Sequence, residues 1–269
     1  MTQTEVRKLL EELCLRPSRA LGQNFLIDGN ILQIIMREAD VRRDETVLEI
    51  GPGLGVLTEV LAARVRRLVA IEKDRRLCEY LREQFPQVEL IEGDAVEVLR
   101  SGFTVHGSGL KVVSNLPYNI STPILEQLVE GELHPRRMVV TLQREVAQRL
   151  AAQPRQKDYG ALTLYTRLRY HCTVAHVISP GCFYPSPQVE SAIVVLDRRD
   201  PRVKLNPGAP FHEIVRCGFG QRRKMLRKLL PDRVDVENRF ARAEVPLTAR
   251  AEELCLEQWI ALANALAEA

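Results

Sequence analysis

The chain has 269 residues and a net charge of +3, with 45% apolar and 27% charged residues. Such a composition is ordinary for globular proteins and excludes fibrous, low-complexity and wholly disordered chains. The length suits one large domain that carries a smaller one.

The first segment, residues 1–15, predicts an amphipathic helix, because Val6, Leu9, Leu10 and Leu13 recur with helical spacing. Glutamates among these apolar positions exclude a secretory signal, and no later apolar run has the length of a membrane span. The six cysteines include no CxxC pair, so neither zinc nor a disulfide framework is indicated. We expect a cytoplasmic protein without a membrane or metal partner.

The central part of the chain alternates between strand and helix patterns. Short runs rich in Val and Ile predict buried strands over residues 46–50, 68–72, 88–92, 111–115 and 138–142, and again over 174–178 and 191–196. Apolar stripes with helical spacing lie between the early runs. This alternation predicts an α/β fold, in which a doubly wound and mostly parallel sheet has helices on both faces.

Beyond residue 206 the pattern becomes helical and basic. Two prolines and a glycine interrupt it within 206–210, which predicts a boundary between a domain of residues 1–206 with an N-terminal helical extension and a small all-α domain of residues 207–269. Residues 198–250 hold 14 Lys and Arg against 6 Asp and Glu. This basic block favours a polyanionic partner.

Part of the basic block is expected to lie on a helix around Met225 and Leu229. Its basic residues are Arg222, Arg223, Lys224, Arg227 and Lys228. A solvated basic face is the plain interpretation of such a run. Contact with RNA phosphates is the functional interpretation, which the local excess of positive charge favours.

Chemistry is expected where the strands end, because ligands bind beyond the carboxyl ends of strands in a doubly wound sheet. The first strand runs into Glu49-Ile-Gly-Pro-Gly-Leu-Gly55, whose glycines let the backbone pass close to a ligand. Glu72, Asp94 and Asn115 end the next three strands. Carboxylates after the second and third strands suit ribose hydroxyls and an adenine amino group. A structural turn and an NAD or FAD site are the alternatives for the glycines.

The run Asn115-Leu116-Pro117-Tyr118 favours a reaction on the exocyclic amine of a nucleobase. An exocyclic nucleobase amine is a poor nucleophile, because its lone pair is delocalised into the ring. The Asn115 side-chain oxygen and the Leu116 carbonyl can each accept one N–H and so free the lone pair, with no general base. Pro117 would fix that carbonyl, and Tyr118 would stack on the base. The same run also suits a simple turn into the next helix.

Three potential metal ligands, His171, Cys172 and His176, lie on a predicted strand. Alternation along the strand puts His171 on the face opposite the other two. We therefore expect no metal site there.

Several motifs in order make the chain resemble the ribosomal RNA adenine dimethyltransferases, which use S-adenosylmethionine (SAM). The resemblance covers residues 16–266. The motifs are Leu21-Gly-Gln-Asn-Phe-Leu26, Glu49 to Gly55, Asn115-Leu-Pro-Tyr-Asn-Ile-Ser-Thr122, Phe183-Tyr-Pro-Ser-Pro-Gln-Val-Glu-Ser191 and Phe219-Gly-Gln-Arg-Arg-Lys224. The last two look like the housekeeping small-subunit enzymes, whereas the resistance methyltransferases of large-subunit RNA are the nearer relatives to exclude.

The resemblance implies that SAM is bound at the strand ends and by the segment before them. The implied cofactor-binding residues are Asn24, Leu26, Gly51, Gly53, Glu72, Asp94 and Asn115. Asn24 and Leu26 would close over the methionine end of SAM, Glu72 would hold the ribose, and Asp94 would hold the adenine. Asn115 would serve both cofactor and target.

The resemblance also implies a catalytic group, which consists of Asn115, Leu116, Pro117, Tyr118 and Phe183. Phe183 would be a second aromatic ring that faces Tyr118 across the target adenine. Without the resemblance, a Phe before two prolines is an ordinary core residue. The chain departs from the family at Gln188, where Lys is usual, and at Lys73, which is an unusual neighbour of Glu72.

Together these features predict SAM-dependent dimethylation of N6 in two adjacent adenosines of small-subunit ribosomal RNA, with a role in small-subunit biogenesis. The expected partner is that RNA within a pre-ribosomal particle. One alternative is a large-subunit methyltransferase of the resistance type, and another is an assembly factor that mainly binds pre-ribosomal particles. An NAD-dependent oxidoreductase is a further class, which would bind NAD and not SAM.

Overall fold

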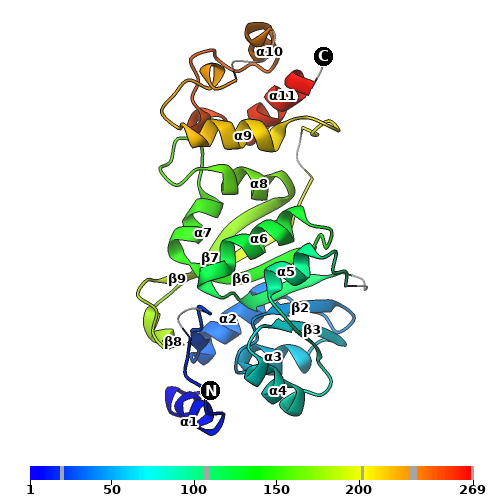
Figure 1. Ribbon diagram of the computed structural model, residues 1–269, viewed down its shortest axis with the longest axis vertical. Helices are drawn as coiled ribbons and strands as arrows, with labels where there is room; N and C mark the ends of the chain where they lie inside the picture. Colours follow the sequence, from blue (N-terminus) through cyan, green and yellow to red (C-terminus); the bar gives the residue numbers. More distant parts are fainter. Residues whose placement is uncertain (19–20, 106–108, 201–202, 231–234, 268–269) are drawn as a thin grey trace. The chain divides into compact units, whose positions relative to one another are not determined.

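The computed structural model describes residues 1–18, 21–105, 109–200, 203–230 and 235–267 (Figure 1). The chain forms two compact units. Unit 1 comprises Met1–Ala147 and Cys172–Arg198, and unit 2 comprises Gln148–His171 and Arg199–Ala269. Residues 148–171 thus group with the C-terminal helices, although the sequence boundary near residue 206 assigns them to the first domain.

Unit 1 is built on a seven-stranded sheet in the order β4-β3-β2-β5-β6-β9-β7. The strands are β2 (Thr46–Ile50), β3 (Arg67–Glu72), β4 (Glu89–Glu92), β5 (Lys111–Asn115), β6 (Arg137–Gln143), β7 (Tyr170–Ile178) and β9 (Ser191–Arg198). Strands β2 to β6 pair in parallel, and β9 pairs antiparallel with β6. The predicted mostly parallel sheet is confirmed, and β7 begins four residues before the predicted start at Val174.

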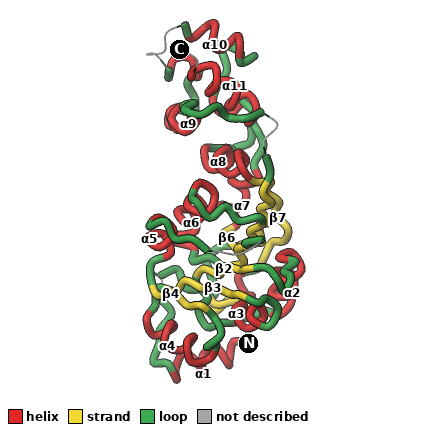
Figure 2. Tube along the Cα trace, turned by 90° about the vertical axis from the view of Figure 1, so that its right-hand side faces the viewer, coloured by secondary structure: helices red, strands yellow, loops and turns green. Residues whose placement is uncertain are grey.

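Helices lie on both faces of this sheet, as predicted. They are α2 (Gly29–Ala39), α3 (Val56–Ala62), α4 (Arg75–Gln84), α5 (Ala95–Arg100) and α6 (Ser121–Glu130), while α1 (Gln3–Glu12) precedes the sheet in the chain and α7 (Arg144–Ala151) runs from unit 1 into unit 2. Apolar side chains of α2 and α3 share one buried cluster with Val47, Val113 and Val139 of the sheet. Helices α5 and α6 lie side by side on the opposite face (Figures 1 and 2).

Side-chain caps fix where several helices begin, and therefore where the strand-to-helix turns lie. Thr2, Asp28, Asp74 and Asp94 each accept backbone N–H groups of the helix that follows. A cap of this kind contributes about 1 kcal/mol to helix stability. Two of them, Asp74 and Asp94, lie two residues after the ends of β3 and β4, so these caps also shape the carboxyl edge of the sheet.

Two short elements join the N-terminal segment to the region before β9. Strand β1 (Phe25–Leu26) pairs antiparallel with β8 (Phe183–Tyr184), and Leu26 is the register partner of Phe183. The expected amphipathic helix is present as α1, whose Val6 and Leu10 are buried in a cluster with Phe25, Leu54 and Leu77. Phe25 of the Leu21–Leu26 motif and Leu54 of the glycine turn are therefore packed together.

Unit 2 is helical and has its own core. Its helices are α8 (Ala161–Arg169), α9 (Phe211–Gly220), α10 (Val236–Arg242) and α11 (Leu256–Ala267), with short 3-10 turns at Leu226–Lys228 and Ala251–Glu253. Phe211, Phe240 and Trp259 are fully buried in its core. The Tyr159 hydroxyl donates to the Leu254 carbonyl at 2.8 Å.

The prediction of a helix around residues 222–230 is wrong. Residues 221–223 form a turn, and only Leu226–Lys228 is helical, as one 3-10 turn. Met225 forms an antiparallel bridge with Arg250, and the Leu226 N–H donates to the Ala249 carbonyl at 2.8 Å. These long-range bonds take the backbone groups that a helix would use within itself.

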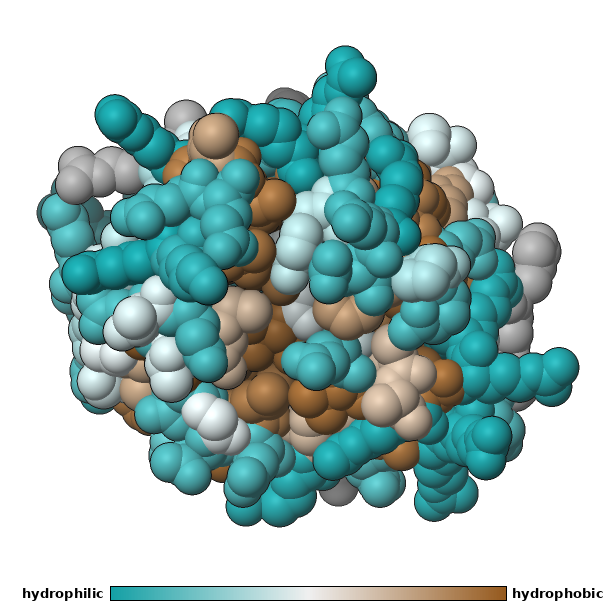
Figure 3. All heavy atoms as spheres, turned by 90° about the horizontal axis from the view of Figure 1, so that it is seen from below, coloured by the Kyte–Doolittle hydropathy of each residue, from teal (hydrophilic) through white to brown (hydrophobic). Residues whose placement is uncertain are grey.

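Within the described residues, every helix is too short or too polar to cross a lipid bilayer. Seen from below, apolar side chains reach the surface in a band bordered by hydrophilic ones (Figure 3).

Candidate active site

A pocket of unit 1 opens at the carboxyl ends of β2, β3, β4 and β5, and it encloses about 1040 Å³ including its open mouth. Its walls include every predicted cofactor-binding residue, namely Asn24, Leu26, Gly51, Gly53, Glu72, Asp94 and Asn115. Of the predicted catalytic residues, Asn115, Leu116, Pro117 and Tyr118 also line it. A pocket therefore lies at the strand ends, where ligand chemistry is expected, whereas Phe183 lies outside the lining.

The glycine turn after β2 has no room for side chains. Gly51 and Gly53 have φ of 68° and 59°, which L-residues rarely adopt. A Cβ on Gly51 would lie 3.1 Å from Pro117 Cγ, and one on Gly53 would lie 3.0 Å from the Phe25 ring. The turn consequently packs against the Asn115 loop and β1, and its bare backbone lines the pocket.

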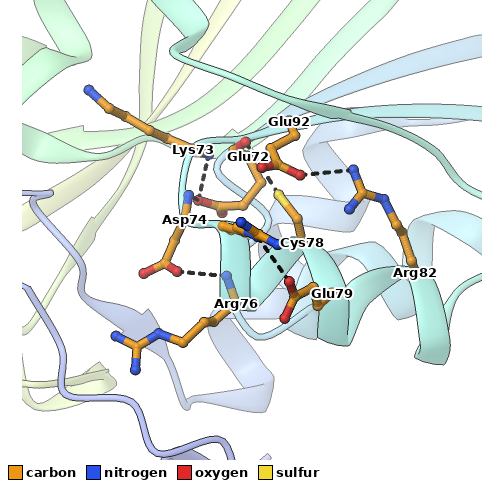
Figure 4. A network of polar contacts seen from close by, with 9 residues as sticks. Glu72, Lys73, Asp74, Arg76, Cys78, Glu79, Arg82 and Glu92 are labelled. Carbon is orange, nitrogen blue, oxygen red and sulfur yellow. Dashed lines mark hydrogen bonds and ion pairs between the residues drawn. The ribbon is translucent and has the colours of Figure 1, made fainter.

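Glu72, the last residue of β3, has a fixed carboxylate. Its Oε1 accepts the N–H groups of Lys73 and Asp74 at 2.8 and 2.9 Å (Figure 4), and its Oε2 accepts that of Gly53 at 3.1 Å. Burial raises the pKa of Glu72, and the three N–H groups oppose that shift. Because Oε2 accepts only one of them, it retains a lone pair for a ligand hydroxyl.

Asp94 lies just after β4, and its two carboxylate oxygens make different contacts. Its Oδ1 caps α5 by accepting the Val96 N–H at 2.9 Å, and its Oδ2 accepts from Lys73 Nζ at 2.8 Å. The Lys73 ammonium holds the pKa of Asp94 below its ordinary value. In Figure 4 the Lys73 side chain extends away from the Glu72 carboxylate, although its N–H contacts that group.

Glu49, the first residue of the glycine motif, is a second buried carboxyl of the pocket and is 1% exposed. Burial raises its pKa to about 8, while the Thr58 hydroxyl, which donates to its Oε2 at 2.8 Å, opposes the shift. At neutral pH this carboxyl is therefore mainly protonated.

Asn115 is the last residue of β5, and in the part of the chain that the structure describes only the nitrogen end of its side-chain amide is held by a hydrogen bond. Its Nδ2 donates to the Asn24 carbonyl at 3.0 Å. Its Oδ1 is buried and has no hydrogen-bond partner among the described residues. A buried amide oxygen without a donor costs free energy, so a ligand N–H that reached this atom would remove that cost.

Tyr118 and Phe183 are neighbours, but they do not form an open clamp. Their ring centroids are 6.4 Å apart and their planes are inclined by 76°. A base between two rings needs parallel planes roughly 7 Å apart, because each stacking contact takes about 3.5 Å. Phe183 is 2% exposed and belongs to a core cluster. The Tyr118 hydroxyl hydrogen-bonds with Ser191, and burial raises the pKa of Tyr118 to about 12.

The predicted basic residues of unit 2 differ in their surroundings. Arg223, Lys224 and Lys228 are exposed. The Arg222 guanidinium instead donates to Glu252 Oε2 at 2.6 Å and to the carbonyls of Lys157 and Gln156 at 2.6 and 2.9 Å. Arg227 lies 3.9 Å from Glu237.

Sequence reasoning missed several residues that line the pocket. Gln23 and Phe25 lie within the Leu21–Leu26 motif, and Glu49 begins the glycine motif, but no sequence signal gives any of the three a role. Lys73 stands out in the sequence only as an unusual neighbour of Glu72. The part of the chain that the structure describes contains no group of three or more His, Cys, Asp or Glu side chains placed to hold a metal ion.

The mostly parallel sheet with a pocket at its carboxyl edge is a Rossmann-like architecture, and together with the similarities given below it places the protein among the methyltransferases that use SAM. The family described as ribosomal RNA adenine dimethylase matches residues 16–268, so this chain belongs to that family.

Curated relatives and solved structures are similar over most of the chain. Ribosomal RNA small subunit methyltransferase A of Geobacter metallireducens is 39% identical over 264 residues, which cover 94% of this chain and 96% of the relative. The protein of the same name from Clostridium botulinum is 35% identical over 257 residues, with coverages of 93% and 94%.

Among solved structures, the 23S rRNA methyltransferase ErmE matches with a TM-score of 0.68 and 28% identity over 90% of this chain and 99% of its own. A dimethyladenosine transferase from Plasmodium falciparum has a TM-score of 0.71 and 23% identity, with coverages of 88% and 95%, and thus shares the fold.

Proposed function

We propose that this chain transfers methyl groups from SAM to the N6 amino groups of two adjacent adenosines in small-subunit ribosomal RNA. Family membership supports an rRNA adenine as the acceptor, and the relatives at 35% and 39% identity are named as small-subunit enzymes. The observation that carries the proposal is the Asn115 amide oxygen, which is buried and without a described partner where β5 ends at the pocket.

The pocket residues fit SAM. The glycine turn lines the pocket with backbone, Glu72 Oε2 has a lone pair for a ribose hydroxyl, and Asp94 is an acceptor for the adenine amino group. Asn24 and Leu26 cover the methionine end. When bound, SAM supplies a methyl group on a positively charged sulfur, so most of the remaining barrier is one of positioning.

Asn115 and Leu116 prepare the acceptor. The Asn115 oxygen and the Leu116 carbonyl each accept one N–H of the target amine, which draws the nitrogen towards tetrahedral geometry and frees its lone pair. Pro117 fixes the backbone of this acceptor pair, and Tyr118 stacks on the base. Stacking on both faces requires Phe183 to move out of its edge-on contact with Tyr118. The proton leaves after the methyl group has arrived, so no general base is needed.

The partner in this proposal is small-subunit RNA within a pre-ribosomal particle in the cytoplasm. The exposed Arg223, Lys224 and Lys228 support phosphate contact, together with Arg227. Arg222 is engaged inside unit 2 and contributes there by holding the loop that carries its neighbours.

Labelling with tritiated SAM tests the substrate. Unmethylated small subunits, naked small-subunit RNA and large subunits are compared, followed by nucleoside analysis. We expect N6,N6-dimethyladenosine in small-subunit material. Label in large subunits alone would assign the chain to the resistance type.

Asn115→Ala tests the mechanism. The variant should lose turnover and keep SAM binding, because Asn115 acts on the acceptor; full turnover would refute the mechanism. If the inactive variant also complements an assembly defect, binding of the particle is the main role and catalysis is secondary.

A further inference from the structure

Thr141, in the middle of the core, has a hydroxyl that packing does not explain. It lies on β6, is 1% exposed, and its Oγ1 has no hydrogen-bond partner among the described residues. Val139 and Ile193, which share its face of the sheet, belong to an apolar cluster. Valine has the same shape and would avoid the loss of hydrogen bonding, so the hydroxyl needs another explanation.

The neighbour of Thr141 on β5 is Asn115. The two residues are register partners in a parallel pair, so their side chains leave the same face of the sheet with Cβ atoms about 5 Å apart. Both carry a buried polar atom without a described partner, so the two atoms are not hydrogen-bonded to each other in this structure; Oδ1 is an acceptor, and the Thr141 hydroxyl is a donor that must rotate to reach it. Because Asn115 Nδ2 is held by the Asn24 carbonyl, Oδ1 is the free end of that amide.

Dimethylation changes the hydrogen bonds that the acceptor amine can offer. In each transfer the nitrogen lone pair forms a bond to the methyl carbon, the methyl–sulfur bond breaks with its electron pair on sulfur, and one N–H proton leaves to water. The unmethylated amine offers two N–H groups to Asn115 Oδ1 and the Leu116 carbonyl. The monomethylated amine offers only one, and a second molecule of SAM supplies the second methyl group.

We propose that Thr141 is a positioning residue for the second methyl transfer, in which its hydroxyl donates to Asn115 Oδ1 once the amine has a single N–H left. This inference rests on the proposed function. The remaining N–H is then held by the Leu116 carbonyl, and the amide oxygen is not left buried without a donor. In the first transfer the amine satisfies Oδ1 itself, and the Thr141 hydroxyl is not required.

The rates of the two transfers test this role. Wild type, Thr141→Val and Thr141→Ser are incubated with unmethylated small subunits and saturating SAM, and N6-methyladenosine and N6,N6-dimethyladenosine are followed with time. For Thr141→Val we expect the second transfer to slow by at least about tenfold more than the first, because one buried hydrogen bond is lost only there. The monomethyl nucleoside should accumulate, and Thr141→Ser should restore the wild-type ratio.

Thr166→Val is the matched control, because Thr166 on α8 of unit 2 also has a buried hydroxyl without a described partner. It should leave the ratio of the two rates as in wild type. For Thr141→Val, an unaltered ratio, or an equal loss in both transfers, would overturn the inference. Wild-type protein that leaves small-subunit adenosines unmethylated would instead refute the proposed function, and the inference with it.

Discussion

Glu49→Gln removes a carboxyl that its surroundings keep protonated. The side chain is buried in β2, and its pKa of about 8 lies well above its ordinary value of 4.5. Glutamine has nearly the same shape, and its carbonyl oxygen can accept the hydrogen bond from Thr58. The substitution therefore changes the titration of this site and little else.

The sign and size of the effect follow from the two pKa values. Between pH 4.5 and pH 8 the unfolded chain has an ionised Glu49, whereas the folded chain has a protonated one, so folding takes up a proton. The stability that Glu49 contributes is therefore full in acid and falls by about 1.4 kcal/mol for each pH unit of rise in this window. The accumulated cost is about 1 kcal/mol at pH 5 and about 3 kcal/mol at pH 7.

The assay is urea unfolding of both proteins near pH 5 and pH 7, followed by far-UV circular dichroism because the one tryptophan, Trp259, lies in unit 2. Glu49→Gln should be more stable than wild type, by about 2 kcal/mol more at the higher pH than at the lower. Glu59→Gln, an exposed carboxyl on α3, is the control and should show no such difference. A Glu49→Gln variant with the pH dependence of wild type would refute the reasoning.

Further predictions concern the ligand and the basic segment. Glu72→Gln should weaken SAM binding about tenfold in calorimetry, since charged hydrogen bonds contribute about 1.5–3 kcal/mol; an unchanged Kd would remove Glu72 from the site. Lys73→Ala frees Asp94 Oδ2 and should tighten SAM binding by at most about fivefold, because exposed ion pairs contribute about 0–1 kcal/mol; weaker binding would mean that Lys73 itself assists the ligand. Arg222→Ala should destabilise unit 2 by about 1–2 kcal/mol in thermal unfolding. Lys224→Ala should leave stability intact and reduce the slope of log K for RNA binding against log salt concentration by about 1. If Lys224→Ala destabilised the protein and Arg222→Ala changed only the salt slope, the roles of these two residues would be exchanged.

The sheet and its pocket were predictable because both follow from local signals. Buried parallel strands are rich in Val, Leu and Ile, and such short runs gave the bounds of Thr46–Ile50 and Lys111–Asn115 correctly although both strands also contain polar residues. Residues that end consecutive parallel strands must meet at one edge of the sheet, which is why Glu72, Asp94 and Asn115 line one pocket.

The features that could not be predicted from the sequence depend on contacts between residues far apart in the chain. The polar and basic run after residue 221 has helical spacing, but its backbone bonds to residues 249 and 250 decide its conformation. The orientation of Phe183 follows from its pairing with Leu26, a bridge too short to leave a periodic pattern. The environment of Thr141 appears only once β5 and β6 are placed in register.

Because β9 runs antiparallel to β6, the two halves of the sheet carry different parts of the candidate site. Ser191 is the register partner of Gln143, so β9 starts at the very rim where β6 finishes, and it delivers the stretch from Phe183 onward to Tyr118. The glycine turn, Glu72 and Asp94 belong to the other half. Substitutions between Phe183 and Ser191 can therefore alter the surroundings of Tyr118, while the contacts of Glu72 and Asp94 on the other half of the sheet stay as they are.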